Sequence, residues 1–229
     1  MTENNHTYKQ RDGGGREILS MLIYRPVANF FLLTFVKNMK VTPNQISLFS
    51  LILMIVASWF FAFTQYPYIL WGILFLHLGY VFDMLDGQYA RYKGLSSKFG
   101  FWFDPFVDTI KAAFIFMALS YVAYVREGSP AVFIWGFIAM TQSFLAYYVL
   151  NTRGQIIKEK FFEVEIKKDI YLGYEVSLYW IISIFVILNS LYVGLIFLAT
   201  AGAFGWIKPF LSLRKYYLTH KETIEKNTA

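Results

Sequence analysis

Residues 83–108 read D-M-L-D-G-Q-Y-A-R-Y-K-G-L-S-S-K-F-G-F-W-F-D-P-F-V-D, which places four aspartates among aromatic and aliphatic residues. Carboxylates are costly to keep in such apolar surroundings. Asp83 and Asp86 lie three residues apart and Asp104 and Asp108 four apart, so each pair would share one face of a helix. We therefore expect two helices, joined by a short basic turn, that together present four carboxylates.

These carboxylates form an oxygen-only ligand set. Such sets suit magnesium, manganese or calcium, and the chain has no cysteine for a thiolate zinc site. Gly100 precedes Asp104 by one turn on the same face, where a missing side chain lets another group approach. The structural alternative, buried ion pairs, is less favoured because unpaired acids inside membranes are mostly functional.

The pattern D-G-x2-A-R-x8-G-x3-D-x3-D, preceded by one further aspartate, resembles the signature of the class I CDP-alcohol phosphotransferase family. It covers about a tenth of the chain, and every fixed position is matched, by Asp83, Asp86, Gly87, Ala90, Arg91, Gly100, Asp104 and Asp108. The resemblance implies an enzyme that moves a phospho-alcohol group from a CDP-alcohol, with CDP-diacylglycerol expected, to an acceptor hydroxyl and releases CMP.

The resemblance also implies roles for single residues. Two ions of Mg²⁺ or Mn²⁺ would be held by Asp83, Asp86, Asp104 and Asp108. Asp108 would be the general base that takes the proton of the acceptor hydroxyl. The CDP group would contact Asp83, Asn44, Gly87, Ala90, Arg91 and Gly100. Two alternatives stay open: close helix packing for Gly87 and Ala90, and a purely capping role for Asn44.

Two basic residues outside the pattern are candidate ligands of a phosphate on the acceptor. Lys111 lies one turn beyond Asp108, and Arg153 follows the fourth apolar segment. Lys111 could equally be a counter-ion for the aspartates, and Arg153 could be a topology anchor. Branches of the family that use inositol phosphate usually show an Arg-rich run after this segment, whereas residues 151–155 contain one arginine.

The composition is that of a membrane protein. Of the 229 residues, 57% are hydrophobic and only 16% charged, and the apolar residues come in blocks near bilayer length. The net charge of +6 therefore reflects basic loops beside anionic lipid headgroups, not nucleic-acid binding. No cleavable signal peptide is expected, because residues 1–15 lack an apolar core.

The sequence predicts an all-α integral membrane protein with six transmembrane helices. Residues 1–15 are expected to be a disordered tail, 16–40 an interfacial amphipathic helix, 41–213 the catalytic membrane domain, and 214–229 a cytosolic tail. A first spanning helix is the alternative for 16–40. The predicted spans are about 43–63, 67–92, 99–125, 131–151, 174–188 and 191–213, with the boundary between the last two the least clear.

The basic residues set the expected orientation. Lysines and arginines gather before the first span, in the turn between the second and third, after the fourth and beyond the sixth, whereas Arg126 alone lies in a loop on the opposite side. This asymmetry places both termini and the aspartate-bearing turn in the cytoplasm, and we expect the cell membrane of a prokaryote. The resemblance adds a homodimer among membrane lipids.

Two other functions compete with the enzyme. A cation-coupled transporter could use the same aspartates as an ion site. No internal repeat is visible, however, and the acids cluster near one membrane face. A catalytically dead scaffold of the same fold is the weaker rival, because all four aspartates remain.

Overall fold

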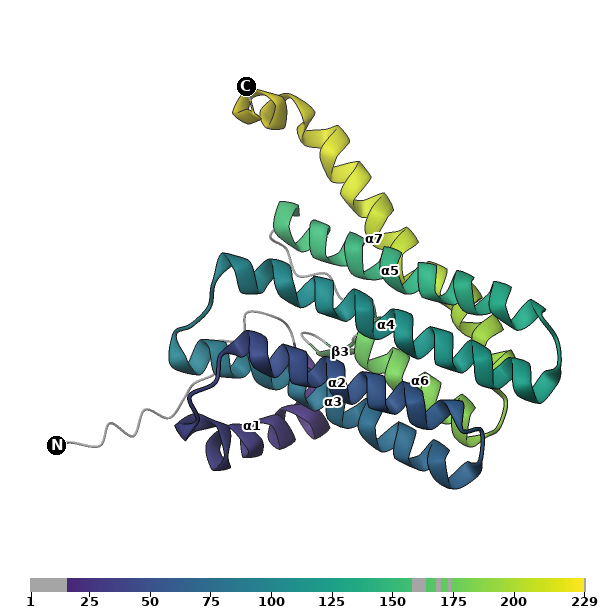
Figure 1. The fold of residues 1–229 in the computed structure, drawn as a ribbon. Helices are drawn as coiled ribbons and strands as arrows, with labels where there is room; N and C mark the ends of the chain where they lie inside the picture. The colour runs from purple at the N-terminus through teal and green to yellow at the C-terminus, as the bar shows by residue number, and fades with distance from the viewer. Residues whose placement is uncertain (1–15, 158–163, 168–169, 173, 229) are drawn as a thin grey trace.

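Helices make up most of the protein (Figure 1). The computed structural model describes the backbone of residues 16–157, 164–167, 170–172 and 174–228, and the side chains of 18–150, 152 and 175–220. Six helices begin within a few residues of the predicted spans, and α5 and α7 end beyond them. They are α2 (Pro43–Ala62), α3 (Tyr66–Lys93), α4 (Lys98–Glu127), α5 (Ala131–Ile157), α6 (Tyr174–Ile187) and α7 (Leu191–Thr228).

Local sequence signals explain where these helices begin and end. Thr42 and Gln45 form a capping box at the start of α2, with Gln45 N donating to Thr42 Oγ1 at 3.3 Å. Gly94 ends α3 at a φ of 67°, a left-handed conformation that favours glycine. Ser97 then caps α4 by accepting from Gly100 N at 3.0 Å. The aspartate-bearing helices are thus joined by a turn of only four residues, 94–97.

Five helices in the described part of the chain are long and apolar enough to cross a membrane: α2, α3, α4, α5 and α7. The remaining apolar helix, α6, has only 14 residues, about 21 Å at the usual helical rise. A sixth span and the orientation of the termini therefore stay predictions. Helix α7 continues to Thr228 with a kink at His220, well beyond the predicted end of the membrane domain at residue 213.

The two aspartate-bearing helices have different neighbours: α3 contacts α1, α2 and α6, and α4 contacts α2, α5 and α7. Helix α2 packs against both α3 and α4, while α5 packs against α4 and α7, and α6 fills the space beside α3 and α7 (Figure 1). Helices α4 and α5 approach closely at Gly136, where an added Cβ would lie 1.8 Å from Ser120 Oγ and 3.1 Å from its Cβ. A larger residue at this position would force the Ser120 side chain on the neighbouring helix to move.

Gly136→Ala should therefore destabilise the protein by about 1–3 kcal/mol, the usual cost of overpacking a core. Thermal unfolding in detergent would show this as a lower melting temperature. Adding Ser120→Ala should recover part of the loss, because it removes the hydroxyl that the new methyl group meets first. An unchanged melting temperature in Gly136→Ala would show that α4 and α5 are not held this closely.

The segment before α2 runs alongside the second half of α3. It comprises β1 (Arg16–Glu17), a π-helical turn (Ser20–Tyr24), α1 (Arg25–Thr34) and a 3-10 turn (Val36–Asn38). Tyr24 bonds His77 at 2.6 Å, the Phe31 and Phe82 rings lie 5.3 Å apart, and Tyr89 donates to the Met39 carbonyl at 3.2 Å. The interfacial location of this segment stays a prediction, and the predicted tail 1–15 lies outside the described residues.

Both ring nitrogens of His77 have partners inside this packing. Its other ring nitrogen lies 3.0 Å from Ser183 Oγ on α6, so the imidazole joins the N-terminal segment, α3 and α6. A small sheet adds a second tie. In it β3 (Ile170–Leu172) pairs in parallel with β1 and antiparallel with β2 (Val164–Lys167), just before α6 begins.

Arg126, in the last turn of α4, bonds two interhelical connections at the end of the bundle opposite the aspartates. Its guanidinium donates to the Asn189 side chain and, at 2.6 Å, to the Thr64 carbonyl. Thr64 and Asn189 both adopt positive φ values, 61° and 54°. The basic residue predicted for the far side of the membrane therefore ties the α2–α3 and α6–α7 connections to the end of α4.

Candidate active site

Three of the four predicted carboxylates converge in the space between α3 and α4. Asp83, Asp104 and Asp108 each offer an oxygen, and these oxygens all lie within 4.8 Å of one another. The four-residue turn between the helices sets this register, bringing the last turns of α3 level with the first turns of α4. We call these three residues the carboxylate cluster.

Lys111 is the cationic partner of the cluster. Its Nζ lies 2.9 Å from Asp108 Oδ1 and also contacts Asp83 Oδ1. Its side chain is 2% exposed, so nearly all of it is removed from solvent. The counter-ion alternative for Lys111 therefore has direct geometric support.

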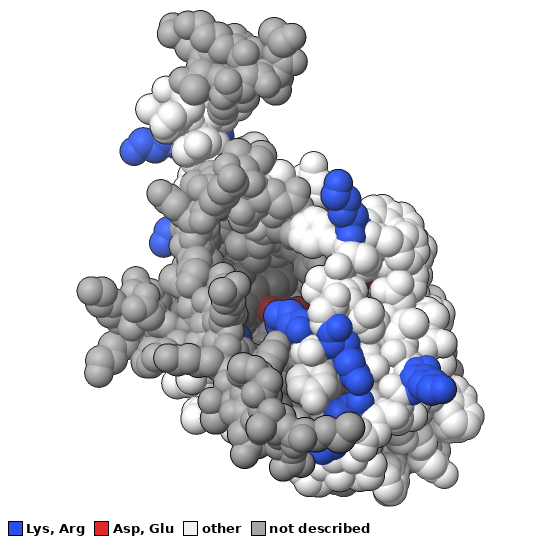
Figure 2. All heavy atoms as spheres, turned by 90° about the vertical axis from the view of Figure 1, so that its left-hand side faces the viewer, with Lys and Arg blue, Asp and Glu red and all other residues white. Residues whose placement is uncertain are grey.

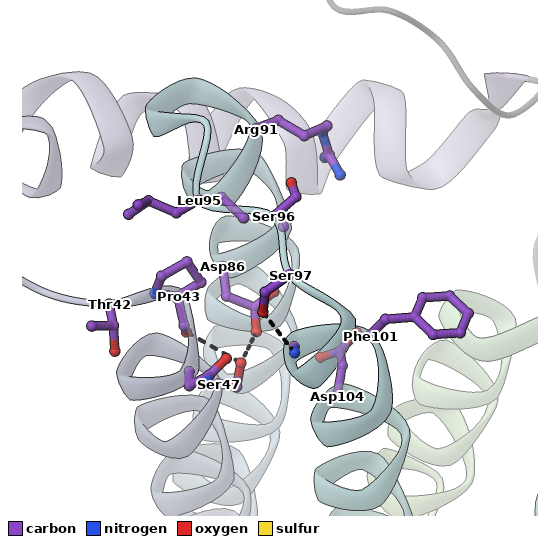
Figure 3. Close-up of a pocket in the computed structure, with 14 residues that line it drawn as sticks. Thr42, Pro43, Ser47, Asp86, Arg91, Leu95, Ser96, Ser97, Phe101 and Asp104 are labelled. Carbon is purple, nitrogen blue, oxygen red and sulfur yellow. Dashed lines mark hydrogen bonds between the residues drawn. The ribbon is translucent and has the colours of Figure 1, made fainter.

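Asp86 is held apart from the cluster. It is buried, and its Oδ2 accepts a hydrogen bond of 2.5 Å from Ser47 Oγ on α2. Ser47 Oγ also lies 3.2 Å from the Pro43 carbonyl (Figure 3). The i, i+3 spacing of Asp83 and Asp86 turns them about 60° apart around α3. One therefore faces α4 and the other faces α2.

A pocket of about 460 Å³ opens beside the cluster. In the close-up, Asp86 and Asp104 lie deep between α2, α3 and α4, with Arg91 nearer the α3–α4 turn (Figure 3). Its lining is Thr42, Pro43, Asn44, Ser47, Asp86, Gly87, Ala90, Arg91, Leu95, Ser96, Ser97, Gly100, Phe101 and Asp104. Of the six residues predicted to contact CDP, five line this pocket, and Asp83 does not. Asp104 belongs to both the pocket and the cluster.

At the two pattern glycines in this pocket, a larger side chain would fill space that is now open. A Cβ at Gly87 would lie 3.3 Å from Arg91 Nη1, within tight contact of the guanidinium. A Cβ at Gly100 would lie 3.3 Å from Ser97 Oγ and 3.6 Å from Asn44 Oδ1. Glycine at these positions therefore keeps open both the space under Arg91 and the approach between α2 and α4.

The surface near the α3–α4 turn is basic, whereas the interior beneath it is acidic. Lysine and arginine side chains gather on this face, and a carboxylate is visible inside the hollow that they border (Figure 2). Such a field favours an anionic ligand at the mouth and cations at the bottom. Arg153 lies on α5, but its side chain is outside the described part of the chain, so its predicted contact with an acceptor stays a prediction.

The described residues fit a divalent cation. The donor set consists of carboxylates alone, which matches hard cations such as Mg²⁺ and Mn²⁺. Asp104 Oδ1 is buried and has no hydrogen-bond partner among the described residues. A buried carboxylate oxygen without a partner is costly, and a bound cation would remove that cost.

Sequence reasoning missed two residues of this region. Ser47, which fixes Asp86, could have been found from its place one turn after the capped start of α2. Glu175, in the first turn of α6, lies close enough to feel the charges of Asp83 and Lys111, and its described partner is the Tyr179 hydroxyl at 3.5 Å. No spacing in the sequence links Glu175 to the other acids. Its position as an acid at the edge of an apolar segment was the one signal that could have identified it.

Comparisons with curated proteins find relatives among lipid-synthesising enzymes. An uncharacterised protein of Aquifex aeolicus is 32% identical over 126 residues, 55% of this chain and 60% of that protein. A phosphatidylinositol phosphate synthase of Corynebacterium glutamicum is 28% identical over 137 residues, 59% of each. An archaetidylinositol phosphate synthase of Pyrococcus horikoshii is 34% identical over 89 residues, 39% of this chain and 46% of that protein. The match thus spans about 60% or less of these relatives' lengths.

Solved structures share the fold. The Mycobacterium tuberculosis phosphatidylinositol phosphate synthase with CDP-DAG bound superimposes with a TM-score of 0.61 at 19% identity, covering 82% of this chain and 92% of that one. The same enzyme in complex with manganese and citrate gives 0.59 at 18% identity, over 82% and 87%. The family model described as CDP-alcohol phosphatidyltransferase matches residues 40–209, three quarters of the chain. This chain belongs to the CDP-alcohol phosphatidyltransferase family.

Proposed function

We propose that this protein transfers a phosphatidyl group from CDP-diacylglycerol to an acceptor hydroxyl and releases CMP. The observation that carries the proposal is the junction of the carboxylate cluster and the pocket at Asp104. A diphosphate bound in the pocket would lie directly beside the oxygens suited to a divalent cation. Family membership and the names of the relatives support the same reaction.

The pocket provides for the CDP half of the donor. Arg91 would pair with the diphosphate through charge-assisted hydrogen bonds, and Gly87 leaves the space for this approach. The cytidine would lie toward the start of α2, where Asn44 and Gly100 come together. Asp86, fixed by Ser47, offers a carboxylate acceptor inside the same pocket.

A second pocket supports a lipid donor. It has a volume of about 470 Å³ and lies between the N-terminal segment, α2 and α3, with a lining of Phe31, Phe35, Val36, Met39, Val41, Gln45, Ile46, Phe49 and Phe82. Val41 adjoins Thr42, which lines the first pocket. We propose that an acyl chain of the donor occupies this apolar space, in line with the CDP-DAG bound to the solved relative.

In the transfer step, Asp108 takes the proton of the acceptor hydroxyl. The acceptor oxygen then forms a bond to the phosphorus that carries the lipid alcohol. The bond from that phosphorus to the bridging oxygen breaks, and CMP leaves with this oxygen. A divalent ion held by Asp83, Asp104 and Asp108 would polarise the phosphate and stabilise charge on the leaving oxygen.

The membrane arrangement completes the proposal. The short apolar helix α6 is the sixth span, both termini face the cytoplasm, and the active site opens to the cytoplasm of a prokaryotic cell. A homodimer is expected, and no surface is assigned to its interface. The transporter rival loses support because the family model covers three quarters of the chain.

The testing experiment is CMP release by purified protein. CDP-diacylglycerol and a smaller CDP-alcohol are offered as donors, with inositol phosphate, unphosphorylated inositol and glycerol phosphate as acceptors, in Mg²⁺, Mn²⁺ or chelator. We expect metal-dependent CMP formation with CDP-diacylglycerol and one acceptor. If no donor and acceptor pair gives CMP, and the protein instead shows metal-dependent uptake of a solute into vesicles, the result would reject the enzyme hypothesis and support the transporter. Donor binding without turnover would indicate the dead scaffold.

Ser47→Ala tests the placement of Asp86. It removes the hydroxyl that donates to the carboxylate at 2.5 Å. Hydrogen bonds to charged groups contribute about 1.5–3 kcal/mol, so kcat/KM for the donor should fall by roughly 10- to 100-fold. Ser50→Ala is the matched control, since Ser50 is a buried serine on the same helix whose hydroxyl bonds the Gly79 carbonyl at 2.9 Å. Equal effects of both changes would contradict a specific role for Ser47.

A further inference from the structure

His77 lies in a chain of hydrogen bonds whose direction is fixed. The Ser183 hydroxyl has one hydrogen, which it donates to the Tyr179 carbonyl at 2.9 Å. Its oxygen is therefore the acceptor of the 3.0 Å bond with His77 Nε2, so this ring nitrogen carries the proton. Nδ1 is then the acceptor, and the Tyr24 hydroxyl donates to it at 2.6 Å. A neutral imidazole completes the chain.

The chain joins three parts of the fold that are far apart in the sequence. Tyr24 belongs to the N-terminal segment, His77 to α3 and Ser183 to α6. Tyr24 is 1% exposed and Ser183 3%, so both lie out of reach of bulk solvent. Loss of the imidazole therefore removes a partner that water does not replace, which is the costly way to lose a hydrogen bond.

The N-terminal segment held by this chain also forms a wall of the apolar pocket proposed for an acyl chain. Five of the nine residues that line that pocket precede α2: they are Phe31, Phe35, Val36, Met39 and Val41. Phe31 follows Tyr24 by seven residues, about 10 Å along a helix. The bond at Tyr24 thus holds the start of the helix whose later turns line the pocket.

Apolar contacts alone fix this wall less precisely. The Phe31 and Phe82 rings lie 5.3 Å apart and both line the pocket, but attraction between apolar surfaces has no preferred direction. A hydrogen bond has a preferred distance and angle. Tyr89 supplies one at the far end of the segment, by donating to the Met39 carbonyl at 3.2 Å. The wall is therefore held between two polar anchors, and the anchor at His77 also reaches α6.

We propose that His77 is a positioning residue for the lipid donor. Its neutral ring fixes the N-terminal segment against α3 and α6, and thereby keeps the wall of the apolar pocket in place. This inference rests on the proposed function, in which an acyl chain of the donor occupies that pocket. His77 belongs neither to the lining of the CDP pocket nor to the carboxylate cluster, so it acts on the binding of the acyl chain and not on the transfer step.

The experiment compares the binding of two donors to the detergent-solubilised full chain. CDP-diacylglycerol carries acyl chains, whereas CDP-glycerol has the same headgroup without them. Loss of a buried hydrogen-bond partner costs a factor of about 5–150, so His77→Leu should raise the Kd of CDP-diacylglycerol by roughly 10-fold. The Kd of CDP-glycerol should stay within about twofold, because this donor does not reach the apolar pocket.

A purely structural role for His77 predicts a different result. Partial unfolding lowers the amount of protein that binds, and a general loosening weakens both donors alike, so the ratio of the two Kd values would keep its wild-type value. An unchanged ratio therefore overturns the proposal. A wild type that binds CDP-diacylglycerol no more tightly than CDP-glycerol overturns it as well.

Three further variants separate the hydrogen bond from the ring. Tyr24→Phe keeps the aromatic ring and removes only the donor, so it should change the Kd ratio in the same direction by roughly three- to tenfold, and it decides the question if His77→Leu does not fold. His77→Gln offers one acceptor and one donor on its amide and should keep the ratio within about threefold of the wild type. Tyr121→Phe, at an exposed tyrosine on α4, is the control and should leave the ratio unchanged.

Amide hydrogen exchange tests the physical cause without any donor. In Tyr24→Phe the amides of α1 should exchange at least about threefold faster than in the wild type, while those of α2 keep their rates. Unchanged exchange in α1 would show that the bond to His77 does not hold the segment, and would reject the proposal.

CMP release by the same preparations tests the proposed function separately. Where CMP forms, the KM for CDP-diacylglycerol should rise in Tyr24→Phe with kcat unchanged. CMP release with an unchanged Kd ratio would keep the transferase and reject the role of His77. A changed ratio without CMP from any donor and acceptor would reject the transferase and keep His77 as a determinant of lipid binding. The two failures are therefore distinguishable.

Discussion

Asp108→Asn should reduce CMP release by at least about 1,000-fold. General base catalysis contributes about 10²–10⁴ to a rate, and the amide cannot accept the acceptor proton. The substitution also removes the negative charge of one of the three converging carboxylates, whose Oδ1 lies 2.9 Å from Lys111 Nζ. The measurement is single-turnover CMP formation at saturating Mn²⁺ and donor, so that weaker ion binding does not mask the effect on the transfer step.

The control for Asp108→Asn is Glu127→Gln, which neutralises an exposed acid at the opposite end of the same helix. We expect its CMP release to stay within about twofold of the wild type, as for most surface changes. Binding of CDP-diacylglycerol should survive Asp108→Asn, because Asp108 does not line the pocket. Turnover by Asp108→Asn within tenfold of the wild type would show that another residue is the general base.

The helices were the readily predicted part of this fold. Their ends follow from short signals that act locally: the Thr42–Gln45 capping box, the capping Ser97, and a glycine at positive φ after α3 and after α4. The apolar blocks between these signals leave few other places for a helix to begin or end. The predicted spans therefore agree with the observed helices to within a few residues, except at the ends of α5 and α7.

The separation of Asp86 from the other three aspartates could not be predicted from their spacing. Intervals of three and four residues both put side chains on one helix face, so the spacing did not distinguish one of the four aspartates from the others. In the structure, Asp83 turns toward α4 and Asp86 toward α2. That division depends on which helices pack on either side of α3. Those contacts form between residues far apart in the chain, so a local pattern could not supply them.

The same limit applies to the remaining parts of the site. Lys111 was noticed because it follows Asp108 by three residues, yet only the α3–α4 register places its ammonium on Asp83 as well. Glu175 approaches the cluster through the start of α6, about seventy residues away from Asp104. The Tyr24–His77–Ser183 chain likewise joins three segments distant in sequence.

Asp104→Asn should separate ion binding from structural support. The buried Oδ1 of Asp104 has no partner among the described residues, although the carboxylate converges with Asp83 and Asp108. Loss of a residue that only supports a metal ligand costs about 10- to 100-fold in metal affinity, so loss of a direct ligand should cost at least about 100-fold. Mn²⁺ binding to detergent-solubilised protein measures this, and CMP release should fall with it.

Stability should move in the opposite direction. A buried carboxylate oxygen without a partner destabilises a fold, and asparagine keeps the shape of the side chain without the charge. The ion-free Asp104→Asn protein should therefore melt at the same temperature as the wild type or higher. Glu127→Gln is the control, because it neutralises an exposed acid at the far end of α4, and its Mn²⁺ affinity should stay within about threefold. A structural role for Asp104 predicts the reverse pair of results: a lower melting temperature with Mn²⁺ binding retained. Binding lost with stability kept therefore identifies Asp104 as a ligand whose cost to the fold is offset by the ion.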